Sequence, residues 1–164
     1  MALKKTLKIK PNQLPSTLRE KTERWIRSRG LKLPSNPNFK DDELDVPADL
    51  TTLNNIQLNN LMNRITILAD YIETELARAS IDELDAETAY EIYTAKLYLT
   101  IKAKNKKMAV SVDDKAVKLQ NDFNVASAKV KLLKAMVNSR DKQYKALSRD
   151  QTRRQHQLEK AKSY

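Results

Sequence analysis

The chain has 164 residues, of which 40% are apolar, 32% charged and 5% aromatic, a size that suits one domain or one domain with an arm. The single glycine and all five prolines lie before residue 48, so residues 48–164 contain neither. Because the turns of a sheet depend on such residues, this excludes barrels, sandwiches and doubly wound α/β folds and predicts an all-α protein. The chain has no cysteine, one histidine and no Gly-rich phosphate loop, so we expect no enzyme, no metal site and no cofactor.

Charge is distributed very unevenly along the chain. The formal net charge is +10: residues 1–40 carry 11 basic and 2 acidic groups, residues 41–101 carry 3 and 13, and residues 102–164 carry 17 and 6. Basic regions of this size favour a nucleic-acid partner. No apolar run approaches the length of a membrane span, and residues 1–20 lack the apolar segment of a signal peptide. We therefore expect a soluble intracellular protein with no membrane partner.

Residues 1–49 are predicted to form a basic arm. Within it, Ser16 is placed to cap a short helix over about residues 16–29, which Gly30 would end. Trp25 on that helix has two equally favoured roles: docking on the rest of the chain, or contact with nucleic acid or another partner. Three prolines punctuate residues 31–49, which predicts an acidic linker that is extended or lies along another surface.

Residues 50–164 are predicted to form a long antiparallel helical hairpin resembling a coiled coil. The first helix spans about residues 52–104, with Thr51 or Thr52 as its N-cap, and the second spans about residues 111–160, capped by Ser111 with Asp114. Apolar residues three and four positions apart give each helix one apolar side. The first stripe comprises Leu58, Leu61, Ile65, Leu68, Ile72, Leu76 and Ala79 and resumes with Leu84, Thr88, Ile92, Ala95 and Leu99. The second comprises Leu119, Phe123, Ala126, Val130, Leu133, Val137, Arg140, Tyr144 and Leu147.

Several consequences follow from the hairpin. Ser80 could begin a new helix, but without glycine or proline there we favour a continuous one. The acidic first helix and the basic second helix are expected to attract each other.

After Leu147 the apolar pattern ends, so we expect a basic tail that frays and whose arginines are dispensable for folding. Apolar residues outside the stripes predict a homo-oligomer; they are Ile56, Met62, Ile67, Tyr90, Tyr93, Leu97, Leu132 and Met136.

Three basic clusters are candidate nucleic-acid-binding sites. They comprise Arg19, Arg24, Arg27 and Arg29 in the arm, Lys104, Lys106 and Lys107 with Lys102 at the hairpin tip, and Arg149, Arg153 and Arg154 near the C-terminus. An antiparallel hairpin returns residues 145–160 beside the start of the first helix, so the arm and C-terminal clusters could form one surface. Ordinary solvated charge is the simpler alternative. For the tyrosines at 90, 93 and 98, helix packing is favoured over base stacking, and the carboxylates at 82–91 fall around their helix, as a solvated face would.

The chain also resembles the UvsY type of recombination mediator from T4-like phages. The resemblance rests on Tyr90 to Lys107 at the end of the first helix, on the Asp-rich start VSVDDKAVK at 110–118, and on the basic run at 148–154. It implies a ring-like oligomer in the cytoplasm of the host cell that binds single-stranded DNA and helps to load a phage recombinase. The alternative hypotheses are a virion or DNA-packaging component, similar to a small terminase or a neck protein and laced together by the arm, and a coiled-coil adaptor without nucleic acid.

Overall fold

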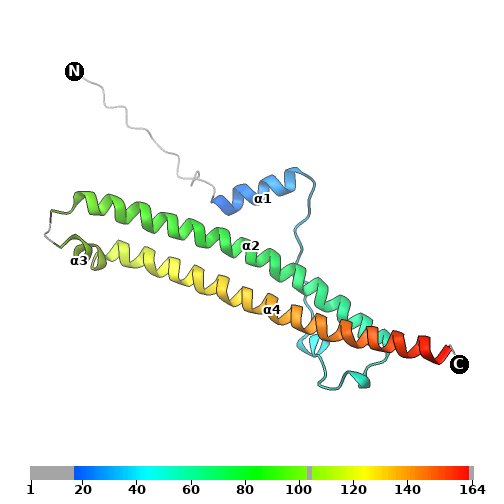
Figure 1. Cartoon of the computed structure of the whole chain (residues 1–164). Helices are drawn as coiled ribbons and strands as arrows, with labels where there is room; N and C mark the ends of the chain where they lie inside the picture. Colours follow the sequence, from blue (N-terminus) through cyan, green and yellow to red (C-terminus); the bar gives the residue numbers. More distant parts are fainter. Residues whose placement is uncertain (1–16, 103–104, 163–164) are drawn as a thin grey trace. The chain divides into compact units, whose positions relative to one another are not determined.

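The computed structural model describes residues 17–102 and 105–162, and it divides the chain into two units, Met1–Lys32 and Leu33–Tyr164. The first unit contains α1 (Leu18–Ser28). The second, here called the hairpin unit, contains the short 3-10 helices η1 (Asp41–Leu44) and η2 (Leu50–Thr52) and the helices α2 (Asn55–Thr100), α3 (Lys106–Ser111) and α4 (Asp114–Lys162) (Figure 1). The described residues contain no strand, which confirms the predicted all-α class.

Helix α1 is closed at both ends by local structure. It follows the N-cap Thr17, whereas the predicted cap Ser16 lies outside the described residues. At the other end, the N–H groups of Gly30 and Leu31 donate to carbonyl oxygens of the last turn at 3.0 and 3.3 Å, with Gly30 at φ +74°. This pair of bonds is a Schellman motif, which requires a residue that tolerates positive φ. Gly30 is therefore the helix stop, as predicted.

Helices α2 and α4 lie side by side and antiparallel, which confirms the predicted hairpin (Figure 1). Near the end of the hairpin opposite the tip, where α2 begins, Gln151 Nε2 donates to Asn59 Oδ1 at 2.9 Å. Near the tip, the Tyr93 hydroxyl donates to Asp113 Oδ1 at 3.0 Å. Helix α2 continues without a break through Ser80, whose hydroxyl donates to the carbonyl one turn earlier at 2.9 Å instead of capping a new helix.

The best-buried part of the core lies at the end of the hairpin where α2 begins. Its side chains come from the first turns of α2 and from α4, and they are Leu58, Leu61, Met62, Ile65 and Leu147. Residues of the expected linker, among them Val46, with Leu50 and Leu53 after it, pack against this cluster, and Arg64 Nη2 reaches Glu43 Oε1 at 3.6 Å. Residues 33–53 thus lie along the hairpin and belong to the same unit, so the division of the chain falls after Lys32 and not at the expected position 49.

The apolar seam of α2 departs from the prediction beyond Ala79. The side chains of Leu84, Ile92 and Leu99 were expected to continue it, but they are 53%, 51% and 83% exposed. The half-buried positions that continue it are 83, 86, 90, 93 and 97. A step of five residues from 79 to 84 turns away from the seam, whereas alternating steps of four and three stay on it. The apolar stripe at 84–99 therefore lies on the outer side of the hairpin, and Tyr90 and Tyr93 take seam positions.

The caps at the start of α2 differ from the prediction. Asn54 is the N-cap, and it exchanges hydrogen bonds of 2.9 Å with Gln57 in a capping box. Thr51 and Thr52 instead belong to η2, because the Asp49 carboxylate accepts both the N–H and the hydroxyl of Thr51, at 2.9 and 2.7 Å. Because the Asp49 carboxylate binds the Thr51 side chain, Thr51 does not cap the long helix, which begins after Asn54 instead.

The hairpin tip is also more structured than expected. Helix α2 ends at Thr100 rather than near residue 104, and the segment between the two predicted long helices contains α3. Ser111, the expected cap of the second long helix, is the last residue of α3, and Asp113 Oδ1 instead accepts the N–H of Ala116 at 2.8 Å. Because Asp113 also accepts the hydroxyl of Tyr93, it both starts α4 and ties α4 to α2.

Candidate nucleic-acid interface

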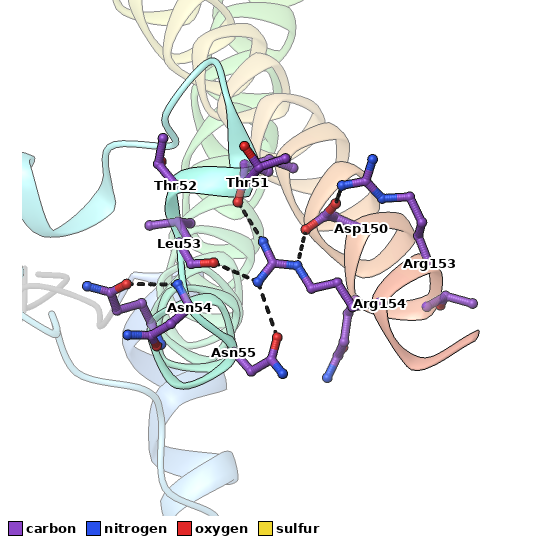
Figure 2. A network of polar contacts seen from close by, with 12 residues as sticks. Thr51, Thr52, Leu53, Asn54, Asn55, Asp150, Arg153 and Arg154 are labelled. Atoms are coloured by element: carbon purple, nitrogen blue, oxygen red, sulfur yellow. Dashed lines mark hydrogen bonds and ion pairs between the residues drawn. The ribbon is translucent and has the colours of Figure 1, made fainter. Parts of the chain in front are cut away.

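Arg154 joins the last part of α4 to the segment that precedes α2 (Figure 2). Its guanidinium donates to the carbonyl oxygens of Leu50 and Leu53 at 2.6 Å each, to Asn55 Oδ1 at 3.2 Å and to Asp150 Oδ2 at 2.7 Å. Four of its five N–H groups are therefore used within the chain. This arginine holds the end of the hairpin closed and has little capacity left for a ligand.

Asp150 is the acidic partner at the centre of this network. It is 7% exposed, and no other charged or polar residue in the described part of the chain is buried to this degree. Arg153 Nη2 reaches its second carboxylate oxygen at 2.5 Å, so two arginines of the next turn neutralise one buried charge. Asp150 was not among the predicted site residues, although positions 147, 150 and 154 continue the spacing of the seam.

The C-terminal cluster therefore does not behave as one surface. Arg149 is exposed and forms no ion pair among the described residues, Arg153 is half-exposed, and Arg154 is largely buried, with 17% of its side chain accessible. The expectation that the tail lies beyond the packed part of the hairpin is wrong for Arg154, because its guanidinium contacts the segment before α2. Whether the arginines are dispensable for folding stays a prediction. Of the three, Arg149 has the freest guanidinium.

The tip cluster is divided in a similar way. Lys106 Nζ donates to the carbonyl of Tyr98 at 3.1 Å and lies 5.2 Å from the centre of its ring. Lys107 lines a shallow hollow of about 480 Å³ together with Tyr90 and Tyr98. Lys104 lies outside the described residues. Lys107 and the neighbouring Lys102 are exposed, so two lysines of this cluster remain accessible.

Tyr93 and Asp49 have shifted pKa values at opposite ends of the hairpin. Partial burial raises the pKa of the Tyr93 hydroxyl above its ordinary value of 10.0, and its hydrogen bond to Asp113 adds to the shift. Hydrogen bonds from Thr51 hold the pKa of the Asp49 carboxyl below its ordinary value of 3.8, and the positive charge of Arg153 acts in the same direction. The Tyr93 shift thus reports the contact that joins α2 to the start of α4, and the Asp49 shift reports mainly the local contacts that form η2.

The arm cluster lies on α1. Glu23 is close to two of its arginines, with Arg19 Nε at 3.3 Å and Arg27 Nη2 at 3.7 Å. The guanidinium of Arg29 stacks over Trp25, 5.5 Å from the ring centre, and Arg24 is exposed. Because α1 belongs to the other unit, the idea that the arm and C-terminal clusters form one surface stays a prediction.

The greatest excess of basic charge in the hairpin unit lies on α4. Residues 123–158 contain nine lysines and arginines but only two acids, Asp141 and Asp150. Both acids are already paired within the helix, Asp141 with Lys145 at 2.6 Å and Asp150 with its two arginines. The ion pairs of Lys145, Arg153 and Arg154 all lie within α4. Six of the nine basic side chains in residues 123–158 therefore have no ion pair among the described residues.

Comparison with protein-family models, with curated proteins and with solved structures found no match. The resemblance to UvsY-type mediators therefore stays a prediction. Within residues 17–102 and 105–162, no helix has both the length and the apolar character needed to cross a membrane, and no three histidine or carboxylate side chains gather as metal ligands would.

Proposed function

We propose that the chain is a non-enzymatic, oligomeric protein that binds nucleic acid through its phosphate backbone. The observation that carries this proposal is the excess of basic side chains on α4: of the nine lysines and arginines in residues 123–158, only Lys145, Arg153 and Arg154 form an ion pair among the described residues. Lysine and arginine bind phosphates electrostatically and without regard to base sequence. The sequence offers many such residues and no base-reading motif, so we expect affinity that is independent of sequence and strongly dependent on salt.

Exposed apolar side chains support the oligomeric part of the proposal. On α2, Leu84, Ile92 and Leu99 are spaced by eight and seven residues, and on α4, Val125 and Leu132 are spaced by seven and are 71% and 64% exposed. Such spacing places the members of each set on one side of their helix. Repeated apolar side chains facing water are typical of surfaces that bind a partner, and a second copy is the partner we propose.

Among specific roles, we propose that of a recombination mediator before that of a virion component. The mediator hypothesis needs single-stranded nucleic acid and a recombinase as partners, and it rests on the resemblance described above. The virion hypothesis relies on an arm that reaches neighbouring molecules. Residues 46–53 of the expected arm and its junction instead pack against the hairpin of their own chain, which favours the mediator.

The test is a titration of the purified protein into fluorescently labelled oligonucleotides, single-stranded and duplex, each in two unrelated sequences. We expect binding in about 50 mM salt, similar affinity for both sequences, and a loss of at least tenfold on raising the salt to about 200 mM. Light scattering with and without oligonucleotide gives the mass of the assembly. A protein that binds neither form at 50 mM salt contradicts the nucleic-acid proposal, and a monomer contradicts the oligomer.

A further inference from the structure

A row of basic side chains runs along one side of α4 and is here called the α4 stripe. Its members are Lys131, Lys134, Lys142, Lys145, Arg149 and Arg153, with Asn138 in line between the second and third. Successive positions are three or four residues apart, which places them on the same side of a helix. At 1.5 Å per residue the stripe is about 33 Å long, and it belongs to the yellow-orange to red part of α4 (Figure 1).

The stripe is accessible and mostly uncompensated. All six basic side chains are exposed. Lys145 and Arg153 each contact one acid of the same helix, whereas for Lys131, Lys134, Lys142 and Arg149 we find no ion pair or hydrogen bond among the described residues. Four cations spaced along one helix without acidic partners repel each other, a cost that a bound polyanion would remove.

We infer that the α4 stripe is the surface on which a nucleic-acid strand lies, parallel to the axis of α4. This inference rests on the proposed function and deepens it by assigning the binding surface. The stripe contains no apolar residue, and the large exposed apolar side chains within its span, Leu132, Met136 and Tyr144, lie off its spacing. A protein partner would need an apolar centre at such a surface, whereas a phosphate backbone needs only regularly spaced cations. Because α4 is one continuous helix over Asp114–Lys162, it keeps these cations in a line.

The number of free cations sets the expected salt dependence. Four phosphate contacts at about 0.7 each predict a log–log slope of about −3 for a single strand. Replacing Lys131, Lys134 and Lys142 by glutamine removes three contacts, so the slope should become shallower by about 2. At about 0.1 M salt the binding constant should then fall on the order of 100-fold, because it scales with the salt concentration to about the second power.

The experiment compares two variants of the full chain with equal loss of charge. The stripe variant is Lys131→Gln, Lys134→Gln and Lys142→Gln. The control variant is Lys96→Gln, Lys118→Gln and Lys129→Gln, three lysines that are also exposed but belong neither to the stripe nor to any of the three candidate clusters. A third variant changes the three stripe lysines to arginine and so keeps their charge. Each is titrated into a labelled single strand of about 12 nucleotides and into the duplex of the same sequence, across a range of salt.

We expect the stripe variant to lose about 100-fold in affinity and about two units of slope, while the control variant stays within about tenfold of the original chain and the arginine variant binds normally. Equal losses in the stripe and control variants, or a stripe variant that binds normally, overturn the inference while leaving the proposed function intact. Failure of the unaltered chain to bind either oligonucleotide overturns both. If the stripe variant binds normally but its assembly mass changes, the stripe forms a contact between copies of the chain. Circular dichroism of each variant confirms that the helices are retained.

Discussion

Removing the guanidinium of Arg154 should destabilise the hairpin far more than removing any other arginine of the basic tail. In the variant Arg154→Met, the carbonyl oxygens of Leu50 and Leu53 each lose a donor at 2.6 Å, and Asp150 loses one of its two cations while staying buried. Removing one partner of a buried ion pair typically costs about 3–5 kcal/mol, because the remaining charge is uncompensated. Arg153 still reaches Asp150, so we expect a loss of about 3 kcal/mol in the free energy of unfolding.

The assay is urea unfolding followed by circular dichroism, with limited proteolysis of residues 33–53 as a second readout. We expect Arg154→Met to lower the stability by that amount and to expose the segment before α2 to protease. The matched control is Arg149→Met, a change of the same kind at an exposed position of the same helix, which should stay within about 0.5 kcal/mol of the original chain. The double variant Arg154→Met with Asp150→Asn should recover part of the loss, because it removes the buried charge as well. Equal stability of the two methionine variants, with unchanged cleavage, would refute this reasoning.

Three further outcomes are expected. Leu147→Ala should lower the free energy of unfolding by about 2–5 kcal/mol in the same urea titration, because Leu147 is 0% exposed. Leu99→Ala, at a position that is 83% exposed, should change the stability of the monomer by less than about 0.5 kcal/mol. Arg140→Leu should be neutral or stabilising in thermal unfolding, because the Arg140 guanidinium donates to Gln143 at 2.8 Å and forms no ion pair among the described residues. A clear loss would mean that its charge is needed. The raised pKa of Tyr93 favours its neutral form in the folded state, so its contribution is fully present below pH 10.0 and is lost as the pH rises through the higher folded-state value. Tyr93→Phe should therefore flatten the decline of stability in alkaline solution, and an unchanged decline would assign it to other groups.

Much of the architecture follows from local features of the sequence. The absence of glycine and proline after residue 47 and the spacing of apolar residues on the second long helix predict two helices and a seam, and Val130 and Leu147 are indeed buried there. Gly30 ends its helix because the Schellman motif needs positive φ. These features depend on neighbours within one or two turns, which is why the sequence alone predicts them.

The tertiary structure decided which of several similar residues are buried or paired and which remain exposed. Leu84 and Leu99 extend a plausible apolar stripe, yet the register of α2 against α4 leaves them outside and places Tyr93 in the seam. Likewise, Arg149 and Arg154 belong to one basic tail and are alike in sequence. The antiparallel return of the chain brings Arg154 to the carbonyl of a residue 104 positions earlier, where it neutralises a buried carboxylate and fills open acceptors, while Arg149 remains exposed on the α4 stripe. Contacts across such a separation depend on how the two helices align, and no local pattern in either helix specifies that alignment.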